Sequence, residues 1–335
     1  MLKRSYFAAA NGYYGFKSYF DNIFKSEKHK RVYVLKGGPG TGKSTLMKRI
    51  TDTVELSGIN YDNVHCSSDP SSLDGVIIYT ANGNYTIVDG TAPHERDAIL
   101  PGAIDTIINL GDNFDIPLLE SRREEIINLN KKKKDAYNTA YSYLHIAGDI
   151  KNKINELITR NFNYEKALHI ISTIKSFASI KDDPPQIALR RAFCKHGYFA
   201  ISGFTTAERI FRISGKYGEE LEFLRIFLDK TDQKYDFISL DPLCGIPDAI
   251  MAQDVSFICT SDQSAEFDAG ECIKSTVSLE ELDSLKAMHD SILSISQKHF
   301  ERASILHAEL EGIYCNAVDF SQNDAIANRI INDIL

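Results

Sequence analysis

The chain has 335 residues, 43% hydrophobic and 25% charged, a composition typical of a globular protein with room for two domains. Its 38 basic and 46 acidic residues give a formal net charge of −8, which argues against broad attraction to nucleic acid or to an anionic membrane. No apolar run reaches about 18 residues, the N-terminus lacks a continuous apolar segment of signal-peptide length, and the six cysteines form no C-x-x-C pair, so we expect a cytoplasmic protein without a disulfide framework or zinc cluster.

The first elements along the chain indicate an α/β domain. Residues 32–36 (VYVLK) have the pattern of a buried strand, and the helix that follows repeats its apolar residues every four positions and should end at Gly58. Further strands are predicted near 63–67, 76–79 and 85–88, the last two joined by a tight Asn-Gly turn. Strands that alternate with helices in this way predict an α/β sandwich.

The most specific motif lies between the first of these strands and its helix. Residues 37–44 read GGPGTGKS and match G-x-x-x-x-G-K-[ST] without a mismatch. Glycines allow backbone N–H groups to turn toward an anion, and the helix N-terminus adds partial positive charge. We therefore predict that ATP binds here, with Lys43 on the β- and γ-phosphates, Ser44 on Mg²⁺ and Thr45 near the α-phosphate. The predicted nucleotide-binding residues are Gly37, Gly38, Pro39, Gly40, Thr41, Gly42, Lys43, Ser44 and Thr45.

Several side chains are candidates for the catalytic chemistry. An acid at the end of an apolar strand usually assists Mg²⁺ binding in such sites, and Asp89 at the end of YTIVD is predicted to hold the ion together with Ser44. The next residue is Gly90 instead of the glutamate of hydrolytic Asp-Glu pairs, so the water-activating base is expected elsewhere. Asp69 and Asp74 follow the strand that comes after the helix of the glycine-rich loop, at the sheet edge where ligand-binding loops of parallel sheets gather.

Each of these candidates also has a structural interpretation. Asp69 precedes a proline, so a turn-forming role is as well supported as a site role. His94 could sense the γ-phosphate or orient water, although a lone histidine is more often structural. The predicted catalytic residues are Lys43, Asp89, Asp69 and His94. An upstream aromatic cluster offers either an adenine-stacking face or core packing, and comprises Phe7, Tyr13, Tyr14 and Phe16.

From Leu118 to about Leu157 the pattern changes to that of one long helix. Its apolar stripe, spaced by three or four residues, can pack against a partner helix. A protein partner bound through the long helices and an oligomer of this chain are both possible. The run Lys131–Lys134 within it is interpreted as a solvated face, with a nucleic-acid contact as the alternative. Another helical pattern follows between Leu279 and Ala308.

Two aspartates and two prolines at 182–185 break the helical pattern. We place a domain boundary there. Residues 1–180 are predicted to form a P-loop NTPase domain with a helical extension, 181–188 a linker, and 189–335 a degenerate domain of the same plan. The predicted fold is thus two tandem P-loop NTPase-like three-layer α/β sandwiches with mostly parallel sheets and long helical extensions.

The evidence for a second copy is internal similarity. Residues 209–227 (RIFRISGKYGEELEFLRIF) align with 31–49, since Gly215 and Gly218 lie 178 residues after Gly37 and Gly40. This alignment places Leu221 and Glu222 under Lys43 and Ser44. Weaker matches continue in order, pairing 238–251 with 65–78 and 255–262 with 85–92. A tandem duplication is indicated, whose second copy should not bind a triphosphate and serves packing or regulation.

The segments GYYGF, VLKGGPGTGKSTLMK, HCSSDPSSLDGVI, IVDGTAPH and PGAIDTIINLG together resemble an uncharacterised bacterial family of tandem P-loop ATPases, over nearly the whole chain. Both halves of that family look like P-loop domains, so this chain departs from it by the loss of the second loop. The resemblance implies binding and hydrolysis of ATP, with no indication of a substrate.

Three functions remain in competition at this stage. The first is slow, regulated, Mg²⁺-dependent ATP hydrolysis coupled to a conformational change. The second is a small-molecule or nucleotide kinase, in which Asp69 or Asp74 activates a hydroxyl acceptor. The third is a nucleotide-sensing scaffold with negligible turnover, whose long helices bind a protein partner. A hexameric AAA-type motor is less favoured, because the sequence identifies no arginine finger or sensor motif, and Arg96, Arg122 and Arg123 are no more than candidates for the finger.

Overall fold

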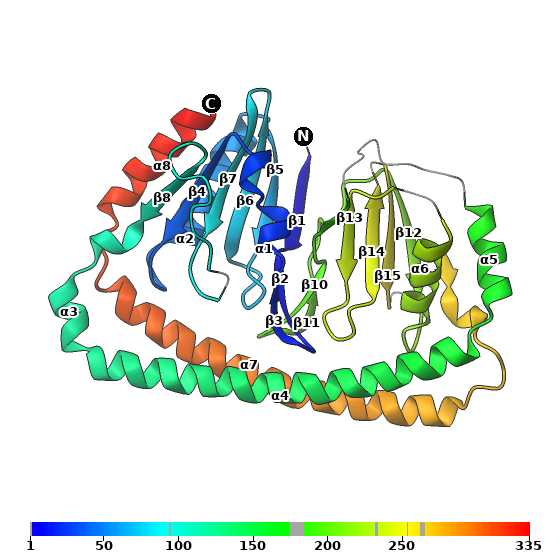
Figure 1. The fold of residues 1–335 in the computed structure, drawn as a ribbon. Coiled ribbons are helices and arrows are strands. Elements are labelled where there is room, and N and C mark those ends of the chain that lie inside the picture. Colours follow the sequence, from blue (N-terminus) through cyan, green and yellow to red (C-terminus); the bar gives the residue numbers. More distant parts are fainter. Residues whose placement is uncertain (1, 94, 175–183, 232–233, 253, 262–264) are drawn as a thin grey trace.

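The computed structural model describes residues 2–93, 95–174, 184–231, 234–252, 254–261 and 265–335. They form two mixed β-sheets, each with helix on one face, and a pair of long helices that runs past both (Figure 1). The chain is therefore mixed α/β with mostly parallel strands, as predicted. None of the helices in this described part combines the length and the apolar character that crossing a lipid bilayer requires.

The first sheet has six strands, and only one of them runs against its neighbours. β6 is antiparallel to β5 and β7, and the other adjacent pairs are parallel. The predicted strand at 32–36 is confirmed as β4, the hairpin of 76–79 and 85–88 as β6 and β7, and the strand expected at 63–67 lies slightly earlier as β5. The strand order is β1 (Lys3–Phe7), β5 (Asn60–His65), β6 (Leu73–Thr80), β7 (Gly83–Asp89), β4 (Arg31–Lys36) and β8 (Asp105–Asn109).

The second sheet repeats the first strand for strand. Its order is β9 (Gln186–Ile187), β13 (Phe237–Leu240), β14 (Pro247–Ala252), β15 (Val255–Thr260), β12 (Arg209–Ser214) and β16 (Phe267–Asp268). Again only the third strand, β14, is antiparallel to its neighbours. The matching strand order and strand directions of the two sheets agree with the internal duplication that the sequence indicates. β9 lies within the expected linker of 181–188, of which 181–183 are outside the described residues.

Smaller elements complete each half. Hairpins β2 (Ala9–Gly12)/β3 (Gly15–Ser18) and β10 (Arg191–Cys194)/β11 (Gly197–Ala200) are equivalent in position, as are helices α2 (Lys43–Leu56) and α6 (Glu219–Lys230). The remaining short elements are α1 (Phe20–Ile23), α3 (Ile116–Ser121) and the 3-10 turns η1 (Ser26–Lys28), η2 (Leu110–Asn113) and η3 (Ala269–Cys272).

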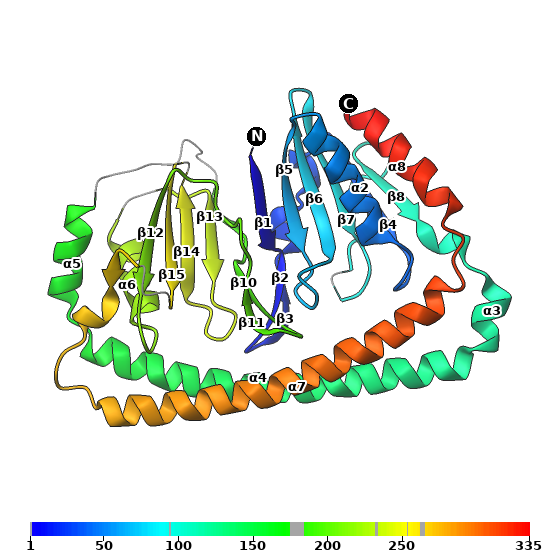
Figure 2. The same ribbon diagram turned by 180° about the vertical axis from the view of Figure 1, so that it is seen from behind.

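The helical extensions cross between the halves. α4 (Arg123–Asn161) leaves the first sheet, spans roughly 60 Å at 1.5 Å per residue, and leads into α5 (Tyr164–Thr173), which packs on α6. α7 (Leu279–Cys315) returns antiparallel to α4 and leads into α8 (Ser321–Ile334), which packs on α2 (Figures 1 and 2). Each extension therefore ends on the opposite half, whereas the sequence assigned each to its own domain.

The packing explains why this exchange is stable. The predicted apolar stripe of α4 includes Ala140 and Leu144, which pack with Phe300 of α7. The apolar face of α8 contributes Ala327 and Ile330 to the core between α2 and the first sheet. Each Å² of apolar surface that is buried stabilises the fold by about 25 cal/mol, so the hydrophobic effect holds both helical extensions against the opposite half. The opposite face of the first sheet shares a core cluster with Phe237 and Met251 of the second half.

Candidate functional site

The glycine-rich loop of residues 37–42 joins β4 to the N-terminus of α2. Gly37, Gly40 and Gly42 all have positive φ, and Gly42 (φ 82°) stands immediately before the helix, where a left-handed backbone favours glycine. Lys43 opens α2, and its Nζ donates to the carbonyl oxygens of Gly37 (3.0 Å) and Gly38 (2.8 Å). The loop thus curls around an ammonium group at the positive end of a helix dipole, an arrangement suited to an anion.

An acid stands beside this lysine. Asp89 ends β7, which lies next to β4, and its Oδ2 is 3.7 Å from Lys43 Nζ. Its other oxygen, Oδ1, accepts hydrogen bonds from the backbone N–H (2.9 Å) and the hydroxyl (2.6 Å) of Thr91. The predicted residues Lys43 and Asp89 are therefore brought together, with one carboxylate oxygen oriented by Thr91 and the other facing the lysine.

The residues predicted to hold Mg²⁺ have suitable donor atoms. Ser44 Oγ accepts a hydrogen bond from Leu73 N (2.9 Å), which leaves a second lone pair on the hydroxyl. Asp89 supplies a carboxylate. The described residues contain no group of three or more His, Cys, Asp or Glu side chains arranged for a metal ion. Mg²⁺ in nucleotide sites is commonly held by one or two protein oxygens together with phosphates and water, so the pair Ser44 and Asp89 fits that ion.

Asp74 is a buried carboxyl group near the start of β6. Burial, followed by the negative charge of Asp89, raises the pKa of Asp74 to about 8, against the opposing effect of Lys43. Asp74 is therefore protonated at neutral pH. A protonated carboxyl cannot accept a proton from water, so Asp74 is not poised as a general base in the free protein.

Asp69 combines the two interpretations that the sequence supported equally. Its Oδ1 accepts from the backbone N–H (3.1 Å) and hydroxyl (2.7 Å) of Ser71, which stabilises the turn, while its Oδ2 pairs with Lys195 Nζ at 2.6 Å. Burial raises the pKa of Asp69, but the hydrogen bonds from Lys195 and Ser71 outweigh it, so the net shift is downward. The carboxylate is ionised and already engaged by a lysine from the second half.

Gly90 is glycine for a steric reason. A Cβ at this position would lie 2.6 Å from Val34 Cγ1 and 2.8 Å from the carbonyl oxygen of Arg96. A glutamate after Asp89 would therefore displace the neighbouring backbone, which explains the departure from the Asp-Glu pair. The other candidate in this loop, His94, lies outside the described residues.

Residues of the second half cover the outside of the glycine-rich loop. Cys315 Sγ, at the end of α7, donates to the carbonyl oxygen of Gly40 (3.4 Å), and Asn323 Nδ2 of α8 donates to that of Thr41 (3.1 Å). A Cβ on Gly40 would lie 2.8 Å from the carbonyl oxygen of Glu311. Contacts with helices 275 and 282 residues further along the chain therefore hold the loop, a feature that the sequence did not predict.

His307 and Glu311 of α7 lie close to the glycine-rich loop. Burial lowers the pKa of His307 on α7, the charges of Lys133 and Lys43 lower it further, and those of Glu311 and Asp69 oppose them. His307 Nε2 is 3.6 Å from Glu311 Oε1. In the run Lys131–Lys134, Lys133 is half-buried and the other three are exposed, in line with a mainly solvated face. The sequence spacing predicts that His307 and Glu311 share a face of one helix. Only the structure shows that this face lies against the loop.

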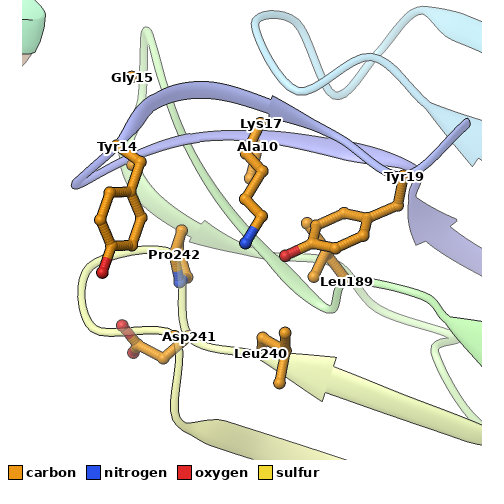
Figure 3. Close-up of a pocket in the computed structure, with 11 residues that line it drawn as sticks. Ala10, Tyr14, Gly15, Lys17, Tyr19, Leu189, Leu240, Asp241 and Pro242 are labelled. Atoms are coloured by element: carbon orange, nitrogen blue, oxygen red, sulfur yellow. The ribbon is translucent and has the colours of Figure 1, made fainter.

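The upstream aromatic residues are occupied elsewhere. Tyr13 stacks on His145 of α4 with ring centroids 4.7 Å apart, and Phe7 is fully buried. Tyr14, which is 71% exposed, faces the Asp241-Pro242 loop of the second half across a cavity of only about 30 Å³ (Figure 3). Such a cavity has room for water but not for a nucleobase. The hairpin therefore joins the two halves, and core and interface packing is the interpretation that the structure supports.

Two of the three arginine candidates have local partners. Arg96 is buried, and its Nη2 donates to Ser26 Oγ at 2.9 Å. Arg122 pairs with Glu125 one turn further along, at 2.8 Å. Arg123 is the first residue of α4. These contacts give Arg96 and Arg122 structural roles within the chain.

The second loop differs from the first in length. Six residues, 37–42, separate β4 from α2, whereas only four, 215–218, separate β12 from α6. The helix N-terminus therefore arrives two residues earlier. The prediction that Leu221 and Glu222 replace Lys43 and Ser44 is wrong, because Glu219 and Glu220 begin α6 at those places. Sequence alignment without a gap could not detect this shortening.

The shortened loop binds its own carboxylate. Glu219 Oε2 accepts hydrogen bonds from the backbone N–H groups of Tyr217 (2.7 Å) and Gly218 (3.1 Å) in a buried position. Lys151 Nζ, from α4, donates to the carbonyl oxygen of Tyr217 at 3.1 Å. An internal anion and a lysine from the other half thus occupy the region that an external phosphate would need.

The neighbouring residues are also engaged within the second half. Leu221 lies in the hydrophobic core, and Glu222 pairs with Arg225 at 2.7 Å and accepts from the hydroxyl of Tyr164 at 3.0 Å. Strand register places Cys259 where the first half has Asp89, since Ile213 pairs with Cys259 as Leu35 pairs with Asp89. The second half therefore has neither the lysine nor the acid of the first.

Comparison with family models, with curated proteins and with solved structures gave no match to this chain.

Proposed function

We propose that the chain binds one ATP with Mg²⁺ at residues 37–45 and hydrolyses it slowly, with a conformational change of the α4–α7 helix pair. A P-loop NTPase-like identity of the first half, with the tandem ATPase family that its motifs resemble, belongs to this proposal. The observation that carries it is the approach of Asp89 Oδ2 to within 3.7 Å of Lys43 Nζ, at the N-terminus of α2. A lysine, a hydroxyl and an acid at a glycine-rich loop are the groups that phosphoryl chemistry requires.

Each residue has a definite role in the proposal. Lys43 would exchange its bonds to the Gly37 and Gly38 carbonyls for bonds to β- and γ-phosphate oxygens. Ser44 and Asp89 would hold Mg²⁺, which neutralises phosphate charge. Thr91 keeps the Asp89 carboxylate in place. Backbone N–H groups of the loop would surround the phosphates.

Slow turnover is inferred because neither of the described candidate acids, Asp69 and Asp74, is ready to act as a general base. Gly90 cannot be replaced by glutamate without a clash, Asp74 is protonated at neutral pH, and Asp69 is paired with Lys195. The lowered pKa of His307 keeps its imidazole neutral, so it is available to orient or deprotonate water if the helices move closer. These facts equally favour the scaffold alternative, in which ATP is held without turnover.

Coupling to a conformational change follows from the composite construction. The loop that would receive the phosphates is bonded on its outside to Cys315 and Asn323. Lys43 would also leave its contacts with the loop when it bound phosphate. A shift of the loop therefore alters the anchorage of α7 and α8, and α7 extends along α4 to the second half.

The test is ATP binding and hydrolysis by the full chain. We expect micromolar or tighter Mg²⁺-dependent ATP binding and ADP release without an added acceptor. Lys43→Ala should weaken the binding or abolish the ADP release. Exposed Lys48 on the same helix supplies the matched control, Lys48→Ala. Tight binding without ADP release would support the scaffold, and ADP release only in the presence of a hydroxyl acceptor would support a kinase. Absence of ATP binding by the wild type would overturn the proposal.

A further inference from the structure

We propose that the groove between α2 and α8 receives the base of the nucleotide and selects adenine over guanine. This inference rests on the proposed function, because it places the base of the same ATP. The groove has a volume of about 290 Å³. Its lining includes Gly42, Thr45, Arg49, Phe320, Asn323 and Asp324.

The position of the groove follows from the loop. Gly42 and Thr45 line it and also belong to the predicted phosphate-binding residues, so the groove is continuous with the phosphate end of the site. A chain of phosphates that ends near Thr45 continues into the nucleoside. Ligand pockets of roughly 300 Å³ are at the small end of the usual range, which suits a base better than a whole nucleotide. The walls from Leu46 and Ala327 are apolar.

Phe320 provides a stacking surface at the mouth of the groove. It precedes the first residue of α8 and is 43% exposed, a large exposure for an aromatic side chain. Its Cε1 atom lies 3.4 Å from the position that a Cβ on Gly42 would occupy, so the ring stands directly beside the loop. Bases stack readily on aromatic rings in this way, and every base offers such a face. Phe320 therefore accounts for affinity and not for selectivity.

Asn323 accounts for selectivity. Its Nδ2 donates to the Thr41 carbonyl, which determines the direction of the amide because a flipped amide would set two oxygens against each other. Its Oδ1 meets no hydrogen-bond donor among the described residues and is closed to solvent in the free protein, so a base in the groove reaches it through a shift of the Asn323 side chain. An unsatisfied buried acceptor is uncommon and calls for a donor. The exocyclic amino group of adenine is such a donor, whereas guanine presents the acceptor O6 on the corresponding edge.

The groove is held in shape by contacts between its two helices. Arg49 of α2 forms an ion pair with Asp324 of α8 and donates from Nη2 to Asn328 Oδ1 at 2.9 Å. These contacts keep α8 against α2 without a requirement for ligand. Asn332, which is exposed further along α8 and does not line the groove, supplies a matched asparagine for comparison.

The experiment is calorimetric titration of the full chain with Mg²⁺ and three probes: ATP, GTP and inorganic tripolyphosphate. We expect the wild type to bind ATP at least about tenfold more tightly than GTP, since a mismatched buried polar group is strongly rejected. Asn323→Leu should bring the ATP-to-GTP ratio close to one, while Asn332→Leu leaves it unchanged. Phe320→Ala should weaken both nucleotides roughly tenfold and leave tripolyphosphate binding unaffected.

The outcomes separate this inference from the proposed function. Equal affinity of the wild type for ATP and GTP, or an unchanged ratio in Asn323→Leu, would overturn the inference while ATP binding at the loop still stood. A wild type that binds neither nucleotide nor tripolyphosphate would remove the proposed function and the inference together. Thermal unfolding of each variant, compared with wild type, confirms that the folded chain is being titrated.

Discussion

Replacement of Lys43 by alanine is the sharpest test of the glycine-rich loop. In the free protein its ammonium group donates to the carbonyl oxygens of Gly37 and Gly38 and lies 3.7 Å from Asp89. In the proposed complex the same group would bond to phosphate oxygens instead. The variant loses both sets of contacts, so it should be affected in stability and, more strongly, in ATP affinity.

The two effects can be given magnitudes. The Gly38 carbonyl keeps a hydrogen bond from Thr41 Oγ1 at 2.9 Å, so loss of the lysine does not strand it, and we expect destabilisation of only about 1–2 kcal/mol. In the complex, exchange of two carbonyl contacts for two charged phosphate contacts is favourable by roughly 2–4 kcal/mol. This corresponds to about a 30- to 1,000-fold weakening of ATP binding.

Calorimetry with Mg²⁺ and ATP measures the affinity, and urea unfolding measures the stability. Lys48→Ala serves as the control, because it removes an equal charge from the exposed side of α2. The reasoning is refuted if Lys43→Ala binds ATP as tightly as Lys48→Ala does. It is also refuted if the entire effect on affinity disappears once unfolding of the variant is taken into account.

Three other predictions concern the acids. Asp89→Asn should reduce turnover far more than ATP affinity, and steady-state hydrolysis with calorimetry checks this; a larger loss of turnover in Asp69→Asn would move the Mg²⁺ assignment to the Asp69 turn. The folded-state pKa of Asp74, about 8, is above its ordinary value of 3.8, so between these pH values the folded chain retains a proton that the unfolded chain releases. The free energy of unfolding therefore falls as pH rises from about 4 to 8. Asp74→Asn should therefore stabilise the protein relative to wild type more at pH 8.5 than at pH 5, by up to several kcal/mol in urea unfolding, and an equal difference at both pH values would contradict the assigned burial. Glu219→Gln should lower the free energy of unfolding by about 1–3 kcal/mol, because two backbone N–H groups lose a charged acceptor, while exposed Glu208→Gln leaves it unchanged. The stoichiometry should remain one ATP per chain in both variants, and a second site in wild type would refute the internal-anion interpretation of the second loop.

The local elements of the first half could be predicted because their signals are local. Alternation and helical spacing define β4, α2, β6 and β7, and the glycine pattern places Lys43 at a helix start. Asp89 was also predictable, since parallel strands that end together bring their last residues to one edge of a sheet. The pairing of Lys43 with Asp89 follows from strand position alone.

The sequence by itself determined the glycine-rich motif and the mixed α/β class, because each depends on spacing within a few tens of residues. It also indicated the internal repeat, because two segments 178 residues apart share their pattern of glycine and apolar residues. Only the tertiary structure decided what surrounds the loop. The contacts of Asn323 and Cys315 with the loop require that α7 and α8 cross to the opposite half. An amphipathic stripe predicts that a helix packs against a partner, but it does not identify that partner. The shortening before α6 was equally invisible, because a gap of two residues between weakly similar segments is seen only when both helices have a position in space. That position puts the carboxylate of Glu219 on the backbone N–H groups of the second loop, which is the physical reason why we propose a phosphate site in the first half alone.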